Sequence, residues 1–273
     1  MTNWNQWDTQ PLLIGAILAS GWVYSLLAGP LRGLFTRVKG YPRKEAAFFA
    51  IGLATFYLAV GSPLDSLGKS THFSAHMFQN NLLMYLSPLL LVLGIPGWMV
   101  DAPAKKIRYF RPAFAFLVNP VVAGTSFTVC LSYLHLPQLY EASLKSGSLH
   151  FVGHLSILCT SALVWWSIAS RSKRFPPLQY GVQILFFFLL MVAQTPVLGF
   201  LFIANQPLYP SYAEAAANLP SFDPVGDQML GGFIFRMTNL TVSLAVMGTA
   251  FYKWSASRTN MATGATQTHT TLA

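Results

Sequence analysis

The feature that most limits the possible folds of this sequence is a series of seven long apolar stretches with almost no charged residues. A helix needs about 20 residues to cross the hydrocarbon of a bilayer, and each stretch is close to that length. The stretches are continuously apolar rather than alternating, and an open sheet would leave backbone groups without partners in lipid. We therefore predict an all-α fold, a polytopic membrane bundle of seven transmembrane helices. The expected spans are 12–28, 46–64, 75–95, 113–134, 151–169, 180–204 and 229–252.

The composition excludes several classes of protein. Hydrophobic residues make up 53% of the chain and charged residues only 9%, too few to cover a soluble domain with a hydrated surface. The net charge of +9 does not indicate nucleic-acid binding, because the basic residues stand in short blocks between the apolar stretches. The sequence also lacks the phosphate-binding, metalloprotease, serine-hydrolase and haem-attachment motifs, so we expect a protein that is not an enzyme.

The distribution of Lys and Arg predicts the orientation. Fourteen of them lie in the first, third and fifth loops and after the last stretch, whereas only Lys69 and Lys145 lie in the loops on the other side. Because Lys and Arg are retained in the cytoplasm, we expect the N-terminus outside and the C-terminus inside. Residues 1–255 would form the transmembrane domain, and the polar, Thr-rich residues 256–273 a disordered cytoplasmic tail.

Histidines gather at the predicted outer end of the bundle. They form two pairs with a spacing of four residues, which places both imidazoles of a pair on one face of a helix. Ser70 or Thr71 would cap the helix before the first pair, and Ser146 or Ser148 the helix before the second. The five histidines at this end are His72, His76, His135, His150 and His154.

The histidine pattern favours a metal site. A single histidine at a helix end is usually a hydrated surface group, but two pairs and a fifth residue at one depth favour copper or zinc. A proton relay or a quinone-type site is the competing interpretation. Met77, Cys130 and Cys159 could add sulfur ligands, although packing is the more common role of such residues in membrane helices.

Three further polar residues could assist the histidines. Asp227 precedes the last stretch and could orient an imidazole from outside the ligand shell, whereas Asp65 is as readily a solvated loop acid. Arg236 lies inside a span and must reach water or pair, with Asp227 or an anion as its partner. Asn80 stands four residues after His76, on the same helix face.

Several ordered motifs between residues 65 and 238 resemble a known family. Residues 72–80 read HFSAHMFQN and residues 87–96 read SPLLLVLGIP. They are followed by LHLP at 134–137, HFVGH at 150–154, the tryptophans 165 and 166, PLY at 207–209 and DQMLGG at 227–232. This series is similar to the CtaG family of assembly factors for cytochrome c oxidase of the caa3 type.

The resemblance implies a seven-helix protein of the bacterial plasma membrane that is needed to produce active haem-copper oxidase, with copper as its cargo. Members of the family commonly carry a histidine where this chain has Asn80. The resemblance further implies oxidase subunits as partners, with an extracytoplasmic copper chaperone and a homodimer as further possibilities. The residues alone also admit a transporter of copper or a small solute, or a haem-binding redox protein.

Overall fold

The computed structural model describes residues 7–37, 40–217, 219 and 222–270. All regular elements within these ranges are helices, which confirms the all-α prediction. Five helices are long and apolar enough to cross a membrane, or up to seven if each of two bent pairs forms one span. The count of seven and the orientation stay predictions.

In chain order the elements are α1 (Pro11–Ala28), η1 (Pro30–Leu34), α2 (Arg43–Gly61), α3 (Pro63–Ser70), α4 (Phe73–Asn81), η2 (Leu82–Leu86), α5 (Ser87–Leu93), α6 (Gly97–Lys106), α7 (Phe110–Leu117), α8 (Pro120–Leu134), α9 (Pro137–Lys145), α10 (Gly147–Ala169), α11 (Tyr180–Ala193), α12 (Thr195–Ile203), α13 (Pro210–Ala216) and α14 (Pro224–Thr270).

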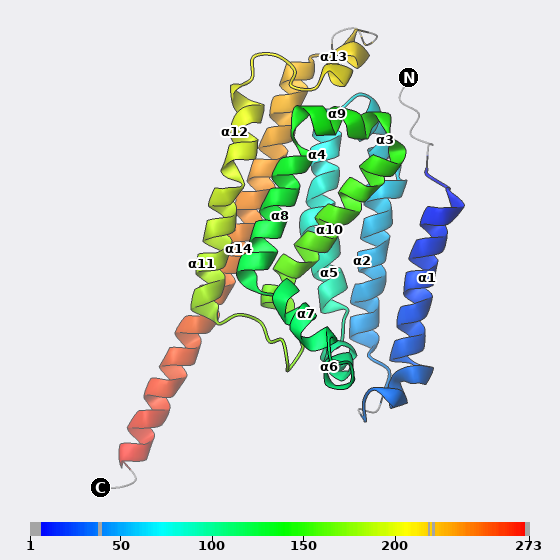
Figure 1. Ribbon diagram of the computed structural model, residues 1–273. Helices are drawn as coiled ribbons and strands as arrows, with labels where there is room; N and C mark the ends of the chain where they lie inside the picture. The colour runs from blue at the N-terminus through cyan, green and yellow to red at the C-terminus, as the bar shows by residue number, and fades with distance from the viewer. Residues whose placement is uncertain (1–6, 38–39, 218, 220–221, 271–273) are drawn as a thin grey trace.

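The long helices run along one bundle, and short helices close its ends (Figure 1). At one end lie α3, α9 and α13, which we call the cap, and at the opposite end lie α6 and α7. Helix α1 stands at the edge of the bundle beside α2. Helix α14 continues beyond the bundle to Thr270, so most of residues 256–273 are helical here. The division of the chain at residue 255 and the disorder of the tail stay predictions, and residues 1–6 and 271–273 lie outside the described ranges.

The outer surface of the bundle is apolar. Leu12, Val121 and Phe200 expose 84%, 73% and 70% of their surface, and many other large apolar side chains point outward. Such a surface would be unfavourable in water but is suited to lipid acyl chains. The exposed side chains therefore support a multi-pass membrane protein.

Local sequence explains where the helices of the cap region begin. The Ser146 hydroxyl accepts a hydrogen bond from the Leu149 N–H at 3.4 Å and caps α10, as predicted. The expected helix start before His72 is wrong, because α3 ends at Ser70 and α4 begins only at Phe73. His72 itself has an extended backbone, with φ −119° and ψ 106°, where the chain turns from α3 into α4.

A backbone carbonyl that lacks its helical partner binds α10 to the span formed by α4, η2 and α5. Pro88 has no N–H, so the carbonyl of Met84 lacks its usual helical partner. The indole Nε1–H of Trp165 donates to this carbonyl at 2.8 Å. Residues 82–86, just before Pro88, form a π-helix. This segment changes the direction in which the side chains of α5 point relative to those of α4. The hydrogen bond from Trp165 thus joins α10 to the segment that directly follows α4.

Candidate metal centre

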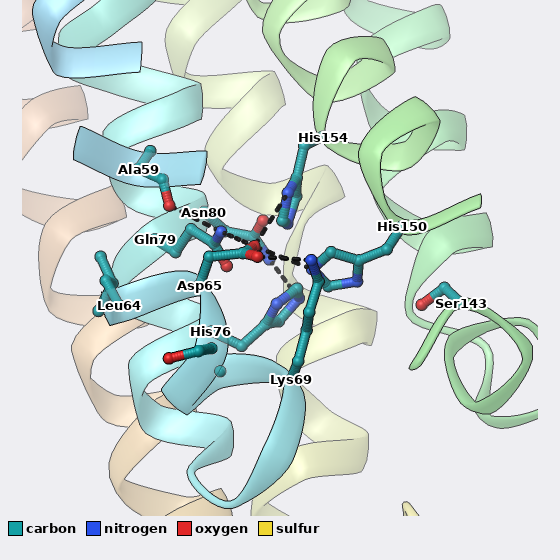
Figure 2. A network of polar contacts seen from close by, with 12 residues as sticks. Ala59, Leu64, Asp65, Lys69, His76, Gln79, Asn80, Ser143, His150 and His154 are labelled. Carbon is teal, nitrogen blue, oxygen red and sulfur yellow. Dashed lines mark hydrogen bonds and ion pairs between the residues drawn. The ribbon is translucent and has the colours of Figure 1, made fainter. Parts of the chain in front are cut away.

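Three buried histidines from two helices meet near the cap. His76 lies on α4 and His150 and His154 lie on α10, and none exposes more than 4% of its surface. One ligand atom from each lies within 4.8 Å of the others. Figure 2 shows the three imidazoles converging on one point. We call these residues the histidine cluster.

Each member of the histidine cluster has one buried ring nitrogen that makes no hydrogen bond to any described residue. Within the described part of the chain, His76 Nδ1, His150 Nε2 and His154 Nε2 are buried and have no hydrogen-bond partner. Buried polar atoms without partners are rare, because each costs about 1–3 kcal/mol of desolvation. Three closely spaced imidazoles, each with such an atom, fit a metal site, because neutral imidazole is a common metal ligand.

Close packing of the backbone brings α3 and α4 together beside α10. A Cβ atom at Gly68 of α3 would lie 3.1 Å from the Cα of His76, so α3 rests directly on α4. The side chains of His150 and His154 project from one face of α10, with ring centroids 4.2 Å apart. The His76 ring lies 5.7 Å from each of these two rings. Helix periodicity therefore places one pair, and interhelical packing adds the third ring.

An acidic side chain that sequence reasoning did not select lies beside the histidine cluster. The Oδ1 atom of Asp65 is 3.3 Å from His150 Nε2 and 3.9 Å from His154 Nδ1. The same oxygen accepts a hydrogen bond of 2.7 Å from Gln79 Nε2, and Oδ2 pairs with Lys69 (Figure 2). Asp65 is 7% exposed and is thus a buried acid, not a solvated loop acid, which the sequence had equally allowed.

Asn80 connects His76 to a fourth histidine. The Asn80 amide Nδ2 lies 2.9 Å from His76 Nε2 and 3.3 Å from His135 Nε2. His135 Nδ1–H donates to the carbonyl of Leu131 at 2.7 Å, so its Nε2 carries the lone pair and accepts from the amide. His135 therefore stands at the edge of the histidine cluster, with ring centroids 5.9 Å from His76, and is not one of the three residues within 4.8 Å.

Three tyrosines connect the cap to the residues around the histidine cluster. The ring of Tyr140 packs 4.8 Å from that of His76, and its hydroxyl donates to the Tyr212 hydroxyl at 2.7 Å. Tyr212 in turn donates to the carbonyl of Gly68, and Tyr209 donates to the carbonyl of His135 at 3.1 Å. Burial raises the pKa of the Tyr140 and Tyr212 hydroxyls above the ordinary tyrosine value, so both stay protonated and act as hydrogen-bond donors.

The structure does not bring the remaining candidate ligands to the histidine cluster. His72 is half-buried, contacts Thr71 through Nδ1 at 2.6 Å and packs on Phe222. It cannot share a helix face with His76, since it precedes the first residue of α4. Met77 faces α14, where a Cβ atom at Gly231 would lie 3.2 Å from its Cγ. Cys130 and Cys159, half-buried and exposed, are outside the group of three.

Asp227 supports the start of α4 instead of orienting an imidazole. Its carboxylate accepts hydrogen bonds from the Ser74 hydroxyl and from the Ser74 N–H, the latter at 3.1 Å. The expected pairing of Asp227 with Arg236 is wrong, because nine residues of one helix separate them by about 13 Å. Arg236 keeps a buried Nη1 atom without a partner among the described residues.

We expect Asp227→Asn to lower stability without changing metal affinity. Loss of the charged acceptor at the first turn of α4 should cost about 1–2 kcal/mol, measured as a lower Tm in detergent. Ser74→Ala, which removes only the hydroxyl, should show a smaller decrease. An unchanged Tm together with a large loss of metal affinity would instead support a direct role at the site.

Sequence reasoning missed the part of the site that comes from the cap, above all from α3. The spacing of Asp65 and Lys69 is a signal for an ion pair within a helix, and Pro63 marks the helix start. Neither signal indicates that α3 folds back onto α4. Of the three tyrosines, Tyr209 appeared in a family motif but not as a site residue.

The known family that the chain matches is consistent with this site. Residues 22–257 match the family described as cytochrome c oxidase caa3 assembly factor, and this region contains the whole histidine cluster. The chain belongs to this family. The CtaG resemblance of its motifs is thereby confirmed, and the family implies an assembly factor for cytochrome c oxidase in a membrane environment. Comparisons with curated proteins and with solved structures gave no match.

Proposed function

We propose that this CtaG-family protein binds a copper ion at the histidine cluster and supplies it to a haem-copper oxidase during assembly. The observation that carries the proposal is the convergence of three buried imidazoles, with ligand atoms within 4.8 Å, in a member of an oxidase assembly family. Imidazole suits copper, and the oxidase requires copper. The protein acts as a metal carrier and not as an enzyme.

The location of the site supports delivery outside the cytoplasm. With the proposed orientation in the bacterial plasma membrane, the cap faces away from the cytoplasm and meets copper brought by an extracytoplasmic chaperone. The partners are then this chaperone and the oxidase subunits, and a homodimer stays a prediction.

Burial of the site means that the cap must open for metal exchange. The cap is held by hydrogen bonds between short helices, such as that from the Ser211 N–H to Glu141 at 3.0 Å. Helix α9 also carries Tyr140, which packs on His76. Displacement of α9 or α13 by a partner would therefore uncover the histidine cluster without disturbing the long helices.

Complementation of a strain that lacks this protein tests the proposal. Wild-type protein should restore oxidase activity and oxidase-bound copper, and His154→Asn should restore neither, because one of three ligands is lost. His72→Asn, outside the histidine cluster, should restore both. Full restoration by His154→Asn would contradict the proposal, as would loss of activity with normal oxidase copper.

A transporter is the second candidate, favoured by one feature. A cavity of about 20 Å³ lies farther along α10 from the histidine cluster and is lined in part by Ser161, Gln194 and Asn239. Polar groups at this depth are what a conduction path would need. Uptake of radioactive copper into proteoliposomes distinguishes the two, because a carrier that delivers on the outer side should show none above the His154→Asn background.

A further inference from the structure

Asp65 and His150 have the spacing of two ligands to one ion. In a tetrahedral site with bonds of about 2.0–2.1 Å, two ligand atoms stand about 3.3–3.4 Å apart. Asp65 Oδ1 and His150 Nε2 are 3.3 Å apart, yet His150 Nε2 has no aligned hydrogen bond within the described residues. Asp65 is not within 4.8 Å of all three ligand atoms, and its oxygens are held by Lys69 and Gln79.

Lys69 provides the positive charge that balances Asp65. Its ammonium pairs with Asp65 Oδ2, and its side chain is 33% exposed, so it reaches from the buried acid toward the surface. A carboxylate with only 10% of its side chain exposed needs such a partner. The flexible four-carbon stem lets the ammonium move into water when another cation arrives.

The types of donor atom at the site determine which metal ions it would prefer. The group of three contains nitrogen alone, Asp65 would add oxygen, and neither cysteine belongs to it. Sulfur ligands favour Cu(I), whereas imidazole with a carboxylate suits Cu(II) and Zn(II). An anionic ligand also stabilises a divalent ion more than a monovalent one.

We propose, on the basis of the proposed metal-carrier function, that Asp65 is the fourth ligand of a divalent ion, Cu²⁺ or Zn²⁺, and that Lys69 is the cation this ion displaces. Binding then exchanges one ammonium for one metal ion at the carboxylate. Return of Lys69 to Asp65 competes with the ion and favours its release to a partner.

Titration of the purified full-length protein with Cu²⁺, Zn²⁺ and Cu⁺ tests the proposal. Lys69→Met should tighten Cu²⁺ binding about tenfold, because the ammonium that competes with the ion for the Asp65 carboxylate is removed. Lys145→Met, which removes an exposed charge at the end of α9, should leave the affinity unchanged. Asp65→Asn should weaken Cu²⁺ binding by more than the roughly 10- to 100-fold typical of a partner outside the ligand shell, and weaken Cu⁺ binding much less.

A double variant makes the test independent of folding defects. In an Asp65→Asn background, Lys69→Met should have no effect on Cu²⁺ affinity, because the carboxylate for which Lys69 competes is absent. An equal effect of Lys69→Met in both backgrounds would overturn the inference, as would equal losses for Cu²⁺ and Cu⁺ in Asp65→Asn. Failure of the wild-type protein to bind any of the three ions would instead reject the metal-carrier function itself.

Discussion

Replacement of both His76 and His154 by alanine should remove all tightly bound metal. Wild-type protein purified from copper-supplemented cells should contain close to one ion per chain, and the double variant essentially none, because two of three imidazoles are lost from separate helices. The measurement is metal analysis of protein that elutes as one peak in size-exclusion chromatography. Both substitutions open space in a buried region, so the single peak is the control that the fold persists.

His72→Ala is the matched control for the double variant. It removes an imidazole from the same end of the bundle but outside the histidine cluster, and the metal content should stay at the wild-type value. Normal metal content in the double variant would reject the site. Loss of metal in His72→Ala would show that His72 and His76 bind the ion together, as their spacing of four residues alone predicts.

Gly97→Ala should produce the largest loss of stability from a single methyl group. A Cβ atom at the start of α6 would lie 2.0 Å from the carbonyl oxygen of Arg171, a backbone atom that cannot rotate away. The loop of Arg171 is held in turn by Asp101 of α6, which accepts from the N–H groups of Lys173 at 3.0 Å and Arg174 at 3.1 Å. We expect a loss of about 3 kcal/mol and a decrease in Tm on the order of 10 °C.

The control for this variant is Gly15→Ala in α1. No atom lies within 4 Å of a Cβ at that position, so alanine should leave Tm equal or slightly higher through its better helix propensity. Thermal unfolding of both variants in the same detergent measures the difference. An unchanged Tm for Gly97→Ala would show that α6 and the Arg171 loop can separate at no cost.

The site could be predicted only in part, and the individual residues show why. His150 and His154 were expected to share a face, and they do, because backbone geometry alone sets the position of residues one turn apart. The same rule failed for His72 and His76, since the chain ends one helix at Ser70 and begins the next at Phe73. A spacing of four residues places two side chains on one face only where a continuous helix contains both residues.

The sequence by itself determined the all-helical fold, the apolar surface for lipid, the family and the local pairing of His150 with His154. These follow from composition and from interactions between residues close in the chain. Only the tertiary structure decided that His76 joins this pair, that Asp65 and Lys69 lie beside it, and that Asp227 supports Ser74. Distances between helices depend on how side chains pack, as at Gly68 and Tyr140, and no single stretch of sequence contains that information.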